Sequence, residues 1–178
     1  MPKAYVQMAE PELPPAGDAA AACTFTFLKA DFVRTFPGKR LPIMQEIREA
    51  HAWALVQLTL TYAEVVSGKF IEELLAVSHR WMKSDQADPD GEQLKAIKAF
   101  LQRPGSKKIK LVWIDAQSMP QDLPKGSRSV VDSAAFKLML AQINMLFLGT
   151  TVLILLDLSY VSRFWVRVAT RTSRAFAR

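Results

Sequence analysis

The sequence predicts an α/β fold in which helices flank a parallel β-sheet. Three short apolar runs indicate strands, at Glu73–Ser78, Ile109–Asp115 and Val152–Leu156. Strands that are buried on both faces of a sheet consist of nearly continuous hydrophobic runs of this kind. Helical patterns separate the three runs, and an order of β-α-β-α-β with short links predicts right-handed crossovers in one sheet. This pattern covers half or slightly more of a doubly wound domain.

Composition favours a single globular domain. The chain has 178 residues, of which half are hydrophobic and 22 % charged, and this is enough for one core. Cys23 is the one cysteine, so no internal disulfide can form and we expect a reducing, cytoplasmic location.

The first part of the chain precedes the predicted core. Residues 1–22 are rich in proline and alanine without periodicity, and we expect a disordered lead. Residues 23–69 are expected to form an N-terminal helical extension. Within it, 23–33 is compatible with a strand or a packing arm, and 51–60 is ambiguous. Pro42 opens a helix, and Thr61 with Glu64 has capping-box spacing.

The predicted α/β domain covers residues 70–165. Asp90 and Gln93 have the spacing of the N-cap and N3 residues of a helix whose apolar face is Leu94, Ile97 and Leu101. A second helix is expected from about Ser133 to Leu148, ending at Gly149.

The stretch Leu138–Val161 requires a test for membrane insertion. Asp157 is its one charged residue, and its length is sufficient to span a bilayer. Polar residues interrupt the stretch, and Gly-Thr-Thr at 149–151 divides it. We therefore expect a helix-turn-strand in a protein without a membrane partner, and a membrane-attached protein is the weaker alternative.

Each predicted strand is followed by polar and aromatic residues. The three clusters are Ser78, His79, Arg80 and Trp81; Asp115, Gln117 and Gln121; and Asp157, Ser159, Tyr160, Arg163 and Trp165. Parallel strands end at one edge of a sheet, where α/β proteins place their ligands, so the clusters are expected to converge. One interpretation is a nucleotide-binding crevice, and the other is that these residues cap the strands and anchor the core.

Other site types have little support. The seven glycines form neither a dinucleotide-binding fingerprint nor a phosphate loop. His51, His79 and Cys23 lie far apart in the sequence, so no metal site is expected.

Five motifs in the same order give a family resemblance. They read LAVSHRW, DPDGEQLKAIKAFL, VWIDAQSMPQ, FKLMLAQINMLFLGT and VLILLDLSYVSRFW. Over about 70–165 they resemble the TIR-like and heterokaryon-incompatibility (HET) domains of algal and fungal proteins. The resemblance implies a flavodoxin-like sheet, a role in intracellular signalling or defence, and self-association or association with related domains.

The resemblance also bears on catalysis. Some TIR-type relatives hydrolyse NAD through a glutamate that lies four residues after the last tryptophan of the S-R-[FW]-W pattern. The corresponding residue here is Ala169, and the family pattern is lost after Trp165. A methyl group supplies neither a base nor a negative charge, so hydrolysis by this route is not expected. Asp115 and Asp157 are the substitute carboxylates in the alternative hypothesis of an NAD or nucleotide hydrolase.

The tail, 166–178, is basic. Arg167, Arg171, Arg174 and Arg178 supply four of the six net positive charges, so no nucleic-acid partner is expected. Together with Arg163 they fall on one helical face. This face is suited to contact with an acidic surface, although a solvated tail is the simpler interpretation.

Overall fold

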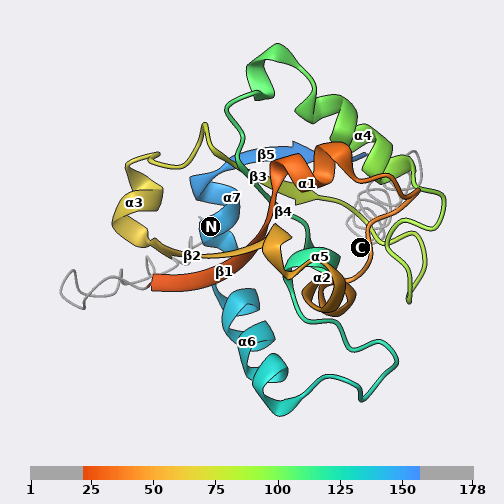
Figure 1. Ribbon diagram of the computed structural model, residues 1–178. Coiled ribbons are helices and arrows are strands. Elements are labelled where there is room, and N and C mark those ends of the chain that lie inside the picture. Colours follow the sequence, from red (N-terminus) through yellow and green to blue (C-terminus); the bar gives the residue numbers. More distant parts are fainter. Residues whose placement is uncertain (1–21, 157–178) are drawn as a thin grey trace, which may run out of the picture.

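The computed structural model describes residues 22–156, which form a five-stranded sheet flanked by helices (Figure 1). The strand order is β2-β1-β4-β3-β5, and the sheet is mixed. The strands are β1 (Ala22–Lys29), β2 (Leu55–Thr61), β3 (Leu74–Ser78), β4 (Leu111–Trp113) and β5 (Thr151–Ile154). The helices are α1 (Ala30–Thr35), α2 (Met44–Ala50), α3 (Tyr62–Val66), α4 (Glu92–Leu101), α5 (Asp115–Ser118), α6 (Val130–Ala141) and α7 (Ile143–Gly149). Two 3-10 turns are η1 (Ala52–Ala54) and η2 (Pro104–Ser106).

The predicted parallel unit is present. β3 lies between β4 and β5 and is parallel to both. Leu75 is paired with Val112 on one side and with Thr151 on the other. β3 is the middle strand of this parallel unit. The chain passes from β3 to β4 on one side of it and then crosses over to form β5 on its other side.

The segment predicted as a helical extension, 23–69, contains the helices α1, α2 and α3, but it is not a separate helical part of the chain. This segment contributes β1 and β2 to the same sheet, and the two strands pair antiparallel from Ala22↔Thr61 to Leu28↔Leu55. The strand signal in β1 is its alternation, because Phe25 and Phe27 are completely buried and Thr24 is exposed. β1 also pairs with β4, antiparallel and through only two residue pairs, Leu28↔Val112 and Lys29↔Leu111. The sheet is thus mixed rather than parallel.

The helix predicted for 133–148 is in fact two helices. α6 begins at Val130, where the Ser129 hydroxyl accepts a hydrogen bond from the Asp132 amide, and the chain bends by 48° between α6 and α7. Within residues 22–156, no single helix meets the length and apolarity criteria for crossing a membrane, while the bent pair α6–α7 does by length and composition.

A further correction concerns the start of α4. The predicted cap Asp90 does not fill this role. Instead, the Asp88 carboxylate accepts hydrogen bonds from the amides of Gln93 (3.2 Å) and Leu94 (2.8 Å), and Gly91 is the N-cap in a left-handed conformation. The loop conformation between Trp81 and Gly91 decides which aspartate reaches the helix, and residue spacing does not reveal it.

Each face of the sheet has its own apolar core. Leu75 and Val77 point to the layer of α1, α2 and α4, and Leu74 and Ala76 point to the layer of α3, α6 and α7. The predicted apolar face of α4 is confirmed: Leu94, Ile97 and Leu101 are buried, and they belong to the first core. Two layers of helices around one sheet is the arrangement expected of an α/β domain.

Candidate functional site

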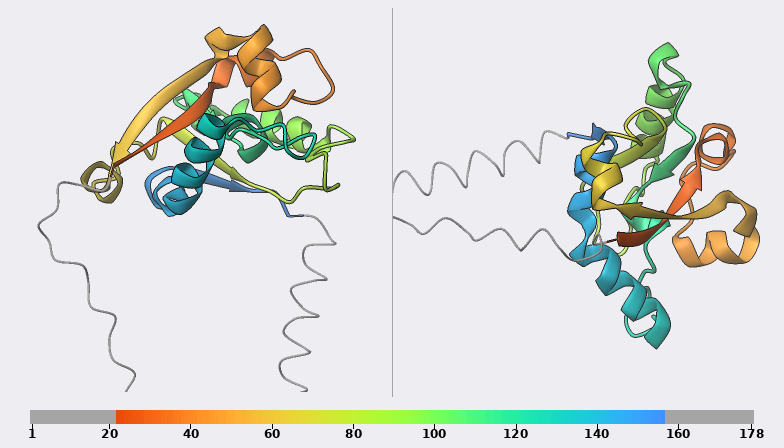
Figure 2. Two further views of the ribbon diagram at one scale, coloured as in Figure 1. Left: turned by 90° about the horizontal axis from the view of Figure 1, so that it is seen from below. Right: turned by 90° about the vertical axis from the view of Figure 1, so that its left-hand side faces the viewer.

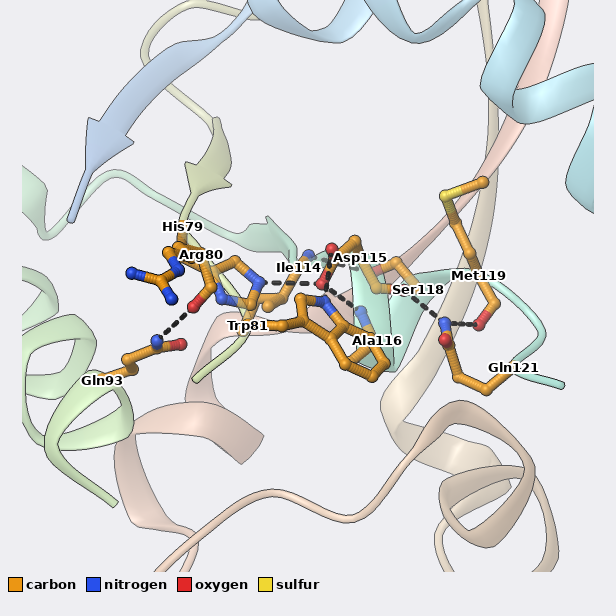
Figure 3. Close-up of polar contacts among 10 residues, drawn as sticks. All are labelled: His79, Arg80, Trp81, Gln93, Ile114, Asp115, Ala116, Ser118, Met119 and Gln121. Carbon is orange, nitrogen blue, oxygen red and sulfur yellow. Dashed lines mark hydrogen bonds and ion pairs between the residues drawn. The ribbon is translucent and has the colours of Figure 1, made fainter. Parts of the chain in front are cut away.

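The clusters after β3 and β4 meet as the convergence argument predicts. Asp115, which follows β4, accepts hydrogen bonds from His79 and Trp81, which follow β3, as Figure 3 shows. Its Oδ1 lies 2.8 Å from Nε2 of His79, and its Oδ2 lies 2.8 Å from Nε1 of Trp81. The backbone amide of Ala116 also donates to Oδ1. The carboxylate therefore ties the ends of the two strands together.

The strand register explains this meeting. Ala76 in β3 is opposite Trp113 in β4, and both strands run in the same direction. β3 ends at Ser78 and β4 ends at Trp113, so both strands leave the sheet at the same edge. His79 thus follows β3 where Asp115 begins α5, and the two side chains face each other.

Burial and charge act in opposite directions on this pair. Burial lowers the pKa of His79 and raises the pKa of Asp115. The hydrogen bond and opposite charges of the two side chains outweigh burial, so the pKa of His79 is raised and the pKa of Asp115 is lowered. The side chain of His79 is 3 % exposed and that of Asp115 is 34 % exposed. The site therefore favours an imidazolium-carboxylate pair.

Gln93 completes the surroundings of the imidazole. Its side-chain nitrogen donates to the carbonyl oxygen of Arg80 at 2.7 Å. Nδ1 of His79 is buried and has no partner in hydrogen-bond geometry within residues 22–156, although Gln93 is close enough to contribute to the raised pKa. Gln93 was predicted as a helix-capping residue, and nothing in the sequence indicated that it would reach the β3 end.

A cavity of about 290 Å³ lies beside the pair. It is enclosed by the ends of β3 and β4, by the start of α4 and by the loop before α2. Its polar lining comprises Arg40, Glu46, His79, Asp85, Gln86, Asp88, Gln93 and Gln117. Trp81 adds an aromatic wall, and Ile43, Leu94 and Ile97 are among its apolar residues. This size is at the lower end of the range for small-molecule sites.

Two of the remaining predicted residues, Ser78 and Gln121, have structural roles. Ser78 accepts a hydrogen bond from the Leu155 amide through its carbonyl oxygen. Arg80 lines a second hollow of about 510 Å³ together with residues 154–156 at the end of β5. Gln121 is buried, and its side-chain nitrogen donates to the carbonyl oxygens of Asp115 (3.1 Å) and Met119 (2.7 Å).

Gln45 on α2 was missed by the sequence analysis. Its side chain pairs with the main chain of Gln121, donating to the carbonyl oxygen at 2.6 Å and accepting from the amide at 3.2 Å. This contact fixes the loop after α5 against α2.

The third predicted cluster lies outside the described residues. It comprises Asp157, Ser159, Tyr160, Arg163 and Trp165, and the same holds for Ala169, for the predicted lead apart from its last residue, and for the tail. Within residues 22–156, no group of three or more histidine, cysteine or acidic side chains could hold a metal ion.

The arrangement has a limited chemical repertoire. A carboxylate-oriented imidazole beside a cavity can exchange a proton with a ligand that reaches Nδ1. In the structure Nδ1 is buried, so a ligand could reach it only after the side chains around it rearrange. The same contacts also stabilise the strand ends without any ligand.

Comparisons were made with protein-family models, with curated proteins and with solved structures, and none of the three gives a match. Functional inference therefore depends on the residues and their geometry.

Proposed function

We propose that this chain is a TIR/HET-like signalling or defence domain with a flavodoxin-like sheet, and that it acts by associating with copies of itself. The observation that carries the proposal is an exposed apolar stripe on α6. This helix extends away from the sheet, as Figure 1 and the right-hand view of Figure 2 show.

The stripe consists of Val131, Ala134, Leu138 and Ala141, all of them exposed. Val131 is 78 % exposed and Leu138 is 67 % exposed. The spacing i, i+3, i+7, i+10 places the four side chains within an arc of about 80° at 100° per residue. Water-exposed stripes with this period are typical of helices that pack against a second helix.

We expect the stripe to pack against α6 of a second copy of the chain. Alternating large and small residues allow two such helices to interlock, with each leucine over an alanine of the partner. An antiparallel pair about a two-fold axis would bring identical stripes together, which is the usual symmetry of homodimers. The ion pair between Arg48 and Asp132, at 3.0 Å, anchors the start of α6 to α2 and leaves the stripe accessible.

The test is the oligomeric state of the full chain with a charge placed on the stripe. We expect sedimentation equilibrium to give a dimer for the unchanged chain and a monomer for Leu138→Lys. Both copies of the dimer lose a leucine, and burial of each is worth about 1.5–3 kcal/mol, so the dissociation constant should rise by at least about a hundredfold.

Leu140→Lys is the matched control. Leu140 lies on the same helix and is 49 % exposed, but it is about 200° from Leu138 around the helix axis. We expect this variant to remain dimeric. An unchanged chain that is monomeric at 100 µM, or equal effects of the two substitutions, would refute self-association through α6.

The second candidate function is NAD or nucleotide binding in the cavity at the strand ends. The observation that favours it is the His79–Asp115–Trp81 cluster beside a cavity of about 290 Å³. An indole offers a stacking surface, and Arg40 offers a partner for phosphate. Hydrolysis by the family route is not part of this proposal, because Ala169 occupies the position of the glutamate.

Nicotinamide release from NAD, measured for the purified chain and for Ala169→Glu, tests both NAD binding in the cavity and the absence of hydrolysis. We expect the unchanged chain to be inactive. Activity in the variant alone would show that the crevice binds NAD and that Ala169 prevents turnover. Turnover by the unchanged chain would contradict the proposal and direct attention to Asp115 or Asp157.

A further inference from the structure

A basic groove lies apart from the strand ends. It is a hollow of about 390 Å³ between the loop after α1 and the outer face of α4. Three lysines line it, Lys39 from the loop and Lys95 and Lys98 from α4, and no aspartate or glutamate is among its lining residues. The other polar side chain is Gln102.

One glycine, Gly91, brings the walls of the groove together. Gly91 has φ of +78°, and a Cβ at this position would lie 2.3 Å from the carbonyl oxygen of Lys39. The two backbones are therefore in direct contact, which only glycine permits. This contact holds the Lys39 loop against the start of α4, so the lysines from two separate segments border one hollow.

The ammonium groups of Lys98 and Lys95 are held in place to different degrees. Nζ of Lys98 donates to the carbonyl oxygen of Phe36 at 2.5 Å, which fixes it on the wall with two N–H groups left. Nζ of Lys95 is 3.7 Å from the Glu92 carboxylate, and both side chains are about three-quarters exposed at 78 % and 74 %. An exposed pair of this length is weak and yields easily to a stronger anion.

We propose that this groove binds a small soluble oligophosphate, a molecule with two or more linked phosphate groups. Three lysines border one hollow whose lining has no carboxylate, and the Glu92 carboxylate contacts Lys95 only at 3.7 Å, so the hollow favours a ligand with several negative charges over a single phosphate. Each phosphate oxygen can accept a charge-assisted hydrogen bond from a lysine, and Gln102 can donate a further one. The site is independent of the proposed self-association and of the cavity beside His79.

Tripolyphosphate is the probe, titrated into the full chain by isothermal calorimetry at 50 mM and 150 mM salt. We expect saturable binding with one site per chain, weaker at the higher salt concentration because surface charges are screened. The double variant Lys39→Gln/Lys95→Gln should weaken binding at least about tenfold, which corresponds to about 1.4 kcal/mol. Both side chains are exposed, so the variant is expected to fold, and its thermal unfolding is measured in parallel.

The double variant Lys107→Gln/Lys108→Gln is the matched control, because it removes the same charge from exposed lysines outside the groove. We expect its affinity to match that of the unchanged chain. An equal loss in both variants would mean that net charge alone attracts the anion, and this would overturn the proposal. Absence of saturable binding to the unchanged chain would also overturn it.

Discussion

Replacing Asp115 by asparagine is the most direct test of the cluster at the strand ends. One carboxylate accepts hydrogen bonds from His79, from Trp81 and from the Ala116 amide. An asparagine side chain keeps a single acceptor oxygen, so at least one of the two buried donors loses its partner. The His79 side chain, at 3 % exposed, cannot turn to solvent without repacking.

The expected cost follows from this geometry. Removal of one partner from a fully buried ion pair costs about 3–5 kcal/mol. Asp115 is 34 % exposed and solvent screens part of the interaction, so we expect a loss of about 2 kcal/mol in the free energy of unfolding. For a chain of this size the melting temperature should fall by about 4–8 °C.

The difference in the free energy of unfolding between the unchanged chain and Asp115→Asn should depend on pH. The raised pKa of His79 means that its contribution is present below its unfolded pKa, near about 6.5, and is lost as pH rises through the folded value. The lowered pKa of Asp115 means that its contribution is present above its unfolded pKa, near about 3.9, and is lost as pH falls through the folded value. The difference should therefore be largest near about pH 5.5.

Thermal unfolding of both proteins at pH 3, 5.5 and 9 measures this profile. Asp31→Asn is the control, because it makes the same chemical change in an ion pair whose carboxylate is 89 % exposed. This control should behave like the unchanged chain. A loss for Asp115→Asn that does not vary with pH would refute the imidazolium-carboxylate pair, even if the variant is destabilised.

Two further predictions concern α4 and the loop before it. Gly91→Ala should destabilise the fold by about 2 kcal/mol or more, because Gly91 has φ of +78° and an added Cβ would meet the Lys39 carbonyl oxygen. Gly105→Ala should be nearly neutral, because no atom lies within 4 Å of an added Cβ there. Chemical denaturation measures the free energy of unfolding of both variants. Asp88→Ala should lower the free energy of unfolding by about 1 kcal/mol through loss of the helix cap, and Asp90→Ala should leave it unchanged. Equal losses for the two variants in the same assay would contradict the assignment of Asp88 as the capping residue.

The parallel unit was predictable because its signals are local. Short apolar runs and a helical face such as Leu94, Ile97 and Leu101 report burial directly. The positions of β1 and β2 were not predictable, because β1 pairs with β4 across more than eighty intervening residues and no local pattern records that contact. A strand signal was present in the alternation around Phe25 and Phe27, but its place in the sheet was not.

The candidate site shows the same division. Parallel strands end together, so the meeting of His79 with Asp115 followed from the topology alone. Gln93 and Asp88 reach the site or the helix start through the conformation of the loop after Trp81, which residue spacing does not determine. The exposed stripe on α6 was also missed, because an apolar helix in a sequence is normally taken for core.

The short joint between β1 and β4 has a consequence for how the protein unfolds. Two residue pairs, followed by a hydrogen bond from the Ala30 amide to the Lys110 carbonyl oxygen, connect the antiparallel ribbon of β1 and β2 to the parallel strands, while seven pairs hold the ribbon itself together. The main-chain hydrogen bonds of the joint should open more readily than those inside either part. In amide hydrogen exchange, Leu28 and Val112 would then report separation of the two parts at a lower free energy than global unfolding. The sheet is continuous in space, yet we expect its main-chain hydrogen bonds to open first at this joint.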